Sequence, residues 1–243
     1  MDRKLLGMLT PSSNTRLEPL TTAILADLPE VTAHFARFRV TEISLNDYGL
    51  DQFGQDARME AALLLADAKC DVIAWNGTSA GWLGFEHDEV LCERINRETG
   101  AASTSSILAN NDLMRRNGIT RFGLVTPYTD DVQSKIIANY AAAGFDCVAE
   151  RHLGITDNFS FSEISPETLA DMCRSVARAQ PQVICVICTN LFSPQLAEPL
   201  EKELGVPIYD STSVVVLRSL ELAGCEPSRV TGWGQVFGSA VSD

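Results

Sequence analysis

The chain has 243 residues, which is enough for one large domain or two small ones with a substantial core. Hydrophobic residues make up 45% of it and charged residues 21%, the composition of an ordinary globular protein. The formal net charge of −13 argues against a nucleic acid or an anionic membrane surface as a partner. The longest apolar runs are too short to span a bilayer, and the N-terminal apolar run breaks at Pro11, too early for a secretory signal. We therefore expect a cytoplasmic protein with no membrane partner.

Short apolar segments alternate with amphipathic segments along the whole chain. Strands are predicted at residues 5–9, 34–40, 71–75, 121–126, 146–153, 182–188 and 207–212. Helices are predicted between them, most clearly at residues 58–69, 106–118, 131–144 and 165–180. Two helices have clear stop signals, at Asn117-Gly118 and Ala143-Gly144. This alternation is typical of α/β proteins in which helices cover a parallel sheet.

An internal repeat divides the chain into two similar halves. GMLTPSSN from Gly7 matches GLVTPYTD from Gly123, and VIAWNGTS from Val72 matches VICVICTN from Val183. A third match pairs STSSIL at residues 103–108 with STSVVV at residues 211–216. Three matches in the same order indicate a duplicated half-domain.

The repeat predicts two pseudo-symmetric, Rossmann-like half-domains, each with a mainly parallel sheet flanked by helices. We assign residues 1–115 and 217–243 to the first and residues 116–216 to the second. Ligands of open α/β sheets bind beyond the carboxyl ends of the strands. The active site is therefore expected in the cleft where the strand-end loops of the two halves face each other.

One cysteine stands out in this cleft because its repeat partner is a glycine. Gly77 aligns with Cys188, and Thr78 aligns with Thr189. The cleft is thus expected to carry a thiol on one wall only. Cys185, three residues earlier in the same predicted strand, is expected on the opposite face, in the core.

The other cysteines and the histidines give no sign of metal or disulfide chemistry. The seven cysteines are scattered and odd in number, and residues 185–188 form a C-x-x-C inside a strand, without the second pair of a zinc knuckle. The three histidines, His34, His87 and His152, are far apart in sequence. We expect reduced thiols, no metal and structural or surface histidines.

Several motifs resemble those of the aspartate/glutamate racemase superfamily over essentially the whole chain. PSSNT at residues 11–15 resembles the maleate cis-trans isomerases. Four further motifs resemble those of the arylmalonate decarboxylases: GTS at 77–79, PYTDDV at 127–132, LGIT at 153–156 and CT at 188–189. The resemblance extends toward the C-terminus through LGVPI at 204–208 and LELAG at 220–224. Racemases and maleate isomerases carry a cysteine in the first-half loop, where this chain has Gly77, as the arylmalonate decarboxylases do. The resemblance also implies an enzyme without a cofactor.

The repeat and the resemblance together suggest a set of site residues. The expected carboxylate and oxyanion contacts are Ser12, Asn14, Gly77, Thr78, Ser79, Tyr128, Asn158 and Thr189. Asn14 and Asn158 resemble carboxylate contacts of the isomerases. The expected apolar wall comprises Leu45, Trp82, Phe159 and Phe161.

The pattern favours decarboxylation of a malonate-type dicarboxylate. Two opposed thiols would permit proton exchange on both faces of a carbon, but one thiol suffices to protonate a carbanion that loss of CO2 creates. Cys188 is therefore expected to rest as a thiol and to protonate an enediolate held by hydroxyl and N–H donors. A cysteine at position 77 is expected to restore a cleft with two thiols.

Two alternatives stay open at the level of sequence. One is a maleate isomerase or racemase acting on a small dicarboxylate, with another residue in place of the first thiol. The other is a binding or regulatory protein that keeps the carboxylate contacts without catalysis. The sequence leaves the oligomeric state, including a homo-oligomer, open.

Overall fold

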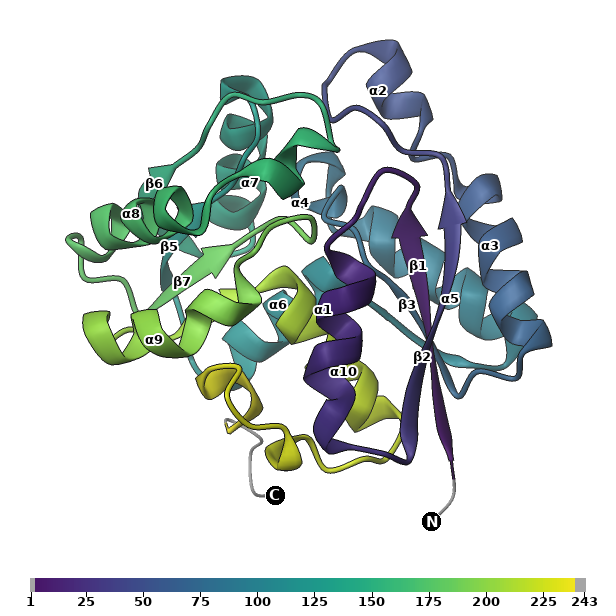
Figure 1. The fold of residues 1–243 in the computed structure, drawn as a ribbon. Coiled ribbons are helices and arrows are strands. Elements are labelled where there is room, and N and C mark those ends of the chain that lie inside the picture. The colour runs from purple at the N-terminus through teal and green to yellow at the C-terminus, as the bar shows by residue number, and fades with distance from the viewer. Residues whose placement is uncertain (1–2, 239–243) are drawn as a thin grey trace.

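Two four-stranded parallel sheets organise the chain (Figure 1). The computed structural model describes residues 3–238, except for the side chain of Gln55. The first sheet has the order β2-β1-β3-β4 and comprises β1 (Lys4–Pro11), β2 (Val31–Phe38), β3 (Val72–Trp75) and β4 (Ala102–Ser105). The second has the order β6-β5-β7-β8 and comprises β5 (Arg121–Val125), β6 (Asp146–Arg151), β7 (Val183–Val186) and β8 (Ile208–Asp210). The predicted fold class is confirmed.

Helices connect the strands and cover the sheets. In the first half they are α1 (Leu17–Ile24), α2 (Asp47–Asp51), α3 (Gln55–Asp67), α4 (Ala80–Leu83), α5 (Glu86–Thr99) and α6 (Ser106–Arg116). In the second half they are α7 (Asp130–Ala142), α8 (Pro166–Ala177), α9 (Pro194–Leu204) and α10 (Ser211–Leu222). Short 3-10 turns lie at Leu25–Asp27, Ser160–Glu163, Pro227–Arg229 and Gln235–Phe237. None of the helices in residues 3–238 combines the length and the apolar character needed to cross a membrane.

Local sequence signals explain where several of these elements begin and end. Ser105 caps α6 by accepting a hydrogen bond from the backbone N–H of Leu108 at 3.1 Å. Gly118 and Gly144, one residue beyond the caps of α6 and α7, take positive φ values of 62° and 87° and reverse the chain, as predicted. β4 was not predicted, because its sequence ASTS is short and polar.

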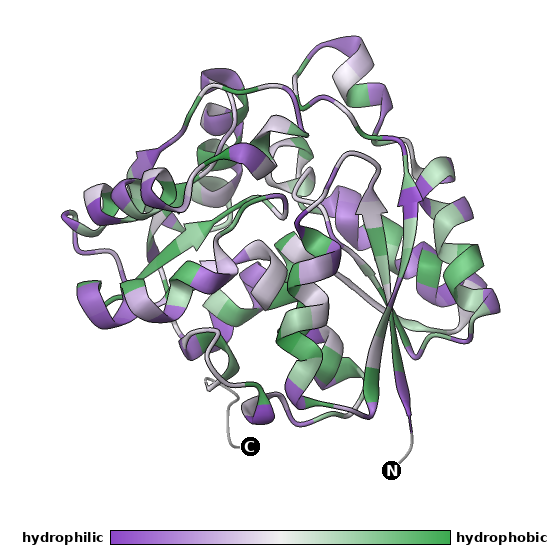
Figure 2. Ribbon diagram, viewed as in Figure 1, coloured by the Kyte–Doolittle hydropathy of each residue, from purple (hydrophilic) through white to green (hydrophobic). Residues whose placement is uncertain are grey.

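The central strands are buried on both faces, as parallel sheets between helices require. All four residues of β3 and of β7 are buried, and Figure 2 shows β7 in the hydrophobic colour. Each buried branched side chain of this kind contributes about 1.5–3 kcal/mol relative to an exposed one. The core therefore fixes the strand ends from which the site is built.

Strand register confirms two of the repeat matches and corrects the third. Gly7 pairs with Ile73 in the first sheet, and Gly123 pairs with Ile184 in the second, as the first two matches require. The third match is wrong by three residues. Trp75 pairs with Ser105, whereas its counterpart Val186 pairs with Asp210, so the STS letters lie on a strand in one half and on a helix in the other.

The two halves meet along α6 and α10, which occupy equivalent positions after β4 and β8. These helices pack against each other, and α10 also contacts α1, β3 and β4 of the first half (Figure 1). The predicted division into residues 1–115 with 217–243 and residues 116–216 remains a prediction. The helix α10 follows β8 of the second sheet in the chain, yet it packs against elements of the first half.

Candidate active site

A narrow cavity lies where the strand-end loops of the two halves meet. Its free volume is about 20 Å³. It is lined by Pro11, Val40, Ile43, Phe53, Trp75, Gly77, Thr78, Trp82, Tyr128, Asn158, Cys188 and Thr189. These residues come from loops at the carboxyl ends of strands in both sheets, the expected place for a ligand in this architecture.

Cys188 lies in this cavity, two residues beyond the end of β7. The chain leaves the sheet through a hydrogen bond from the N–H of Ile187 to the carbonyl of Val125. The thiol is 3% exposed and accepts a hydrogen bond from the Asn190 N–H at 3.4 Å. Burial raises the pKa of Cys188 to about 12, although the Asn190 N–H and the Tyr128 hydroxyl act in the opposite direction. The group is thus a thiol at neutral pH, as expected, and its role as a proton donor stays a prediction.

Two hydroxyls from opposite halves meet at one side of the cavity. The Thr78 Oγ1 and the Tyr128 Oη are 2.6 Å apart. Burial and the nearby Cys188 raise the pKa of Tyr128 well above its ordinary value, so its hydroxyl keeps its proton. The Tyr128 ring is held by edge contacts with Trp82 at 5.3 Å and Phe161 at 5.6 Å. The site therefore holds neutral hydroxyl donors close to the thiol.

Thr189 joins the two strand-end turns. Its hydroxyl donates to the Asn76 carbonyl at 3.0 Å and accepts from the Asn14 amide at 3.0 Å. The Asn14 side-chain oxygen, Oδ1, in turn accepts from the N–H groups of Arg16 and Leu17 at the start of α1. Asn14 is buried behind Thr189 and is not among the lining residues, so in this structure it supports a wall of the cavity.

Asn158 lines the cavity from the loop that follows β6. Its side-chain amide donates to the Ser13 hydroxyl at 2.7 Å, and its backbone carbonyl accepts from the Asn190 side chain at 2.6 Å. The neighbouring backbone pairs with the loop after β2 through an antiparallel bridge between Glu42 and Asp157. The equivalent loops of the two halves thus close over the cavity together.

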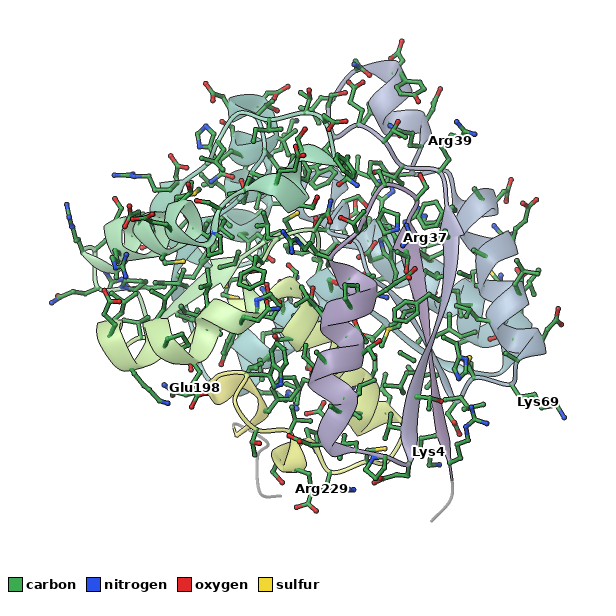
Figure 3. The ribbon with its side chains drawn as sticks, in the orientation of Figure 1. Lys4, Arg37, Arg39, Lys69, Glu198 and Arg229 are labelled. Atoms are coloured by element: carbon green, nitrogen blue, oxygen red, sulfur yellow. The ribbon has the colours of Figure 1, made fainter. Side chains whose placement is uncertain are left out.

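Besides Asn14, two more of the predicted contacts, Ser12 and Ser79, do not line the cavity. Ser12 is exposed and exchanges hydrogen bonds with the backbone of Val40 at 3.1 and 3.2 Å. Its backbone carbonyl accepts a hydrogen bond from Arg37 of β2, which is labelled in Figure 3. Its neighbour Ser13 is the serine that reaches Asn158. Ser79 is fully buried, its hydroxyl has no partner among the described residues, and it does not line the cavity.

The predicted apolar wall is wrong in three of its four members. Only Trp82 lines the cavity. Phe159 is 47% exposed, Phe161 packs behind the Tyr128 ring, and Leu45 lies beyond Ile43 in the loop after β2. The apolar lining is supplied instead by Pro11, Val40, Ile43, Phe53, Trp75 and Trp82. No signal in the repeat identifies the members from the loop after β2, because the facing loop in the other half has a different length and sequence.

The wall opposite the thiol is covered by Trp75. A Cβ atom added to Gly77 would lie 1.9 Å from Cζ2 and 2.3 Å from Cη2 of the indole. A side chain at position 77 would require the indole to shift, because the ring occupies that space. The expectation that a cysteine at 77 restores a cleft with two thiols stays a prediction, and Trp75 is the residue that would have to move. The sequence contained one signal for this: the repeat pairs Trp75 with the much smaller Val186.

The histidines lie outside the cavity lining. His34 hydrogen-bonds Thr32, and His152 lies between Glu150 and Asp130 at the surface. The seven cysteines are all free thiols. Among residues 3–238, no cluster of three or more His, Cys, Asp or Glu side chains has the arrangement of a metal site.

Comparison with known proteins matches residues 6–237 to the model of one family, arylmalonate decarboxylase. The chain belongs to this family. Relatives include maleate isomerase of Geobacillus stearothermophilus, 26% identical over 92% of this chain and 94% of the relative. Arylmalonate decarboxylase of Bordetella bronchiseptica is 27% identical over 94% of this chain and 91% of the relative.

Solved structures of the family share the fold. A mutant of Nocardia farcinica maleate cis-trans isomerase with a covalently bound succinylcysteine intermediate superposes with a TM-score of 0.87, at 25% identity over 96% of this chain and 98% of the other. An arylmalonate decarboxylase structure gives 0.79 at 23% identity, over 97% and 100% of the two chains. Members with either activity are similar to this chain to nearly the same extent. The likeness thus places it among the enzymes of this family and favours neither activity.

Proposed function

We propose that this protein is a cofactor-independent decarboxylase of malonate-type dicarboxylates, including arylmalonates, with Cys188 as the proton donor. The observation that carries the proposal is the asymmetry of the cavity. Gly77 occupies the position in the first half that Cys188 occupies in the second, and neither it nor the neighbouring Trp75 has a group that exchanges protons or attacks carbon. A reaction that needs one proton delivered from one side fits this arrangement, and a reaction that needs two opposed thiols does not.

Loss of CO2 is favoured by the surroundings of the departing carboxylate. The lining residues include no charged side chain in the part of the chain that the structure describes, and half of them are apolar. A carboxylate against Val40, Ile43 and Phe53 loses its hydration without gaining a cation, and conversion to neutral CO2 removes that cost. The electron pair of the broken C–C bond passes into the remaining carboxylate, which becomes an enediolate.

Neutral hydrogen-bond donors stabilise the charge that develops. The Thr78 and Tyr128 hydroxyls lie together near the thiol, and the Asn158 amide reaches the cavity from the loop after β6. Preorganised donors of this kind are worth about 2.7–4 kcal/mol each in oxyanion holes. They hold the enediolate in place while the proton moves.

Protonation from one wall completes the reaction. The Cys188 S–H bond breaks, its proton goes to the α-carbon, and the sulfur keeps the electron pair as a thiolate. The Asn190 N–H, 3.4 Å from the sulfur, stabilises that thiolate until it takes a proton from water. Because the donor stands on one side only, the product should be a single enantiomer.

Maleate isomerisation is the second candidate. It is favoured by Asn158 in the lining and by maleate isomerases among the relatives, which act on a dicarboxylate. In this chain the covalent step would fall to Cys188, whose pKa of about 12 makes a poor nucleophile at neutral pH. Racemisation is disfavoured for want of a second base opposite the thiol.

The experiment is to incubate the purified protein separately with 2-methyl-2-phenylmalonate and with maleate. We expect CO2 release and one enantiomer of 2-phenylpropionate, carrying one deuterium at the α-carbon when the solvent is D2O. Cys188→Ser should lower this rate at least about a hundredfold, the usual scale for a general acid. Cys185→Ser, in the core and outside the cavity, is the matched control and should keep the rate.

Other outcomes distinguish the alternatives. Fumarate from maleate without CO2 from the malonate would replace the proposal with isomerisation. Binding of both dicarboxylates with turnover of neither would indicate a binding protein. Full decarboxylation by Cys188→Ser would refute the assignment of the proton donor.

A further inference from the structure

The geometry points to Trp75 as the residue that determines substrate specificity, by filling the first-half wall of the cavity and limiting the size of the substituent on the reacting carbon. This inference rests on the proposed function for the identity of the substrate, but its steric basis is independent of any activity. Trp75 is fully buried at the end of β3 and lines the cavity beside Gly77.

The indole occupies a volume that a side chain at position 77 would otherwise fill. Three of its ring atoms lie within 2.4 Å of the place of a Cβ on Gly77, a separation that no pair of non-bonded carbons adopts. Gly81, in the helix that follows, is different, because a Cβ there would meet its nearest neighbour, Ile136, at an ordinary 3.5 Å. Close approach to an aromatic ring is therefore specific to Gly77.

Neighbouring side chains hold the indole in this position. The Phe38 ring lies 5.1 Å from it, tilted by 49°, and the Arg58 guanidinium lies over the ring at 5.6 Å. Arg58 is itself buried, bonded to the Phe53 carbonyl at 2.6 Å and 3.9 Å from the buried carboxyl of Asp88. An aromatic side chain and a buried cation both pack against the indole, which opposes its movement away from Gly77.

The space left in the cavity is limited. Its free volume is about 20 Å³, far below the range of about 300–1,000 Å³ for typical small-molecule sites, so the size of the lining side chains decides what can enter. Replacing the indole with a smaller side chain would widen the cavity beside Gly77.

A double-mutant cycle tests the steric claim without any substrate. Gly77→Ala should lower the melting temperature by about 4–10 °C in the native background, the cost of overpacking a core. In the Trp75→Leu background the same change should shift it by less than about 2 °C. Gly81→Ala is the control and should have the same small effect in both backgrounds. Equal losses for Gly77→Ala in the two backgrounds would overturn the claim that the indole occupies this space.

A size series tests the specificity claim. We expect Trp75→Leu to raise kcat/KM for 2-methyl-2-(2-naphthyl)malonate, relative to the phenyl analogue, by about tenfold or more, with Trp75→Phe intermediate. Affinity for the matching 2-arylpropionates, measured by calorimetry, should change in the same order. An unchanged ratio in both folded variants would refute the inference.

The two failures are distinguishable. If the native protein released no CO2 from any malonate, the proposed function would fail, whereas the melting temperatures and the arylpropionate affinities would still decide the role of Trp75. If CO2 were released but neither variant altered the size preference, the proposed function would stand and this inference would fall.

Discussion

Removal of the Tyr128 hydroxyl is the sharpest test of the charge-stabilising side of the cavity. In Tyr128→Phe the 2.6 Å contact with Thr78 is lost, and with it one of the donors near the thiol. Loss of one oxyanion donor costs about 2.7–4 kcal/mol in the transition state, so kcat should fall about 10²–10³-fold. The Thr78 hydroxyl also loses its partner in a buried place, which destabilises the fold by about 1–3 kcal/mol.

These two effects are separable by a matched variant. Tyr140 is also fully buried, and its hydroxyl accepts from the Asn110 amide at 3.3 Å, but it lies outside the cavity. Tyr140→Phe should lower the melting temperature to a similar extent, about 2–4 °C per kcal/mol, and leave kcat unchanged. Single-turnover measurement of CO2 release, with melting curves for both variants, provides the comparison. If Tyr128→Phe retained the native kcat, or if both variants lost activity equally, the assignment of Tyr128 as an oxyanion donor would be refuted.

Three further outcomes follow from the buried groups. Because burial raises the pKa of Cys188 to about 12, its alkylation by iodoacetamide should be slow at pH 8 and should become about tenfold faster per pH unit up to that value. The less buried Cys225 should react first, and peptide mass spectrometry reports the order of modification. A rate for Cys188 that reaches a plateau near pH 8 would contradict this expectation. Burial also raises the pKa of Asp210 from 3.8 to about 6, so between these values the native state holds a proton that the unfolded state releases. As the pH rises from 4 to 6, the native protein should therefore lose on the order of 3 kcal/mol of unfolding free energy relative to Asp210→Asn, measured by urea denaturation. A difference between the two proteins that does not depend on pH would rule this out. Thr189→Val should lower the free energy of unfolding by about 1–3 kcal/mol, because it removes the hydrogen bond to the Asn76 carbonyl. Thr189→Ser should recover most of that loss in thermal melting curves, and equal stability of the two variants would contradict this role of the hydroxyl.

Much of the fold follows from patterns that are local in sequence. The alternation of apolar and amphipathic segments predicts the parallel sheets, and the repeat predicts which strand-end turns face each other. The sheet register then places Gly77 and Cys188 in equivalent positions, and both line the cavity. A strand such as β4, with the sequence ASTS, escapes this reasoning because it is held by neighbouring strands and not by its own hydrophobicity.

The details of the site depend on side-chain directions that periodicity does not carry. Ser12 and Ser13 are adjacent, yet only Ser13 reaches Asn158, and the choice is set by the bend after β1. The Asn14 side chain hydrogen-bonds to the Leu17 N–H at the start of α1 and to the Thr189 hydroxyl, and the motif alone does not reveal these partners. The position of the Trp75 ring beside Gly77 was not predicted for the same reason. Trp75 ends an apolar strand, and the sequence pattern of such a strand indicates only that its residues belong to the core.

The covering of Gly77 by an indole also couples two positions of the sequence. A Cβ atom at position 77 would lie 1.9 Å from the ring of Trp75, so a side chain gained at 77 requires the indole to shift or to be replaced by a smaller residue. Conversely, an indole placed as it is here requires glycine at 77. In this chain the presence of a second thiol is therefore decided at position 75 as much as at position 77.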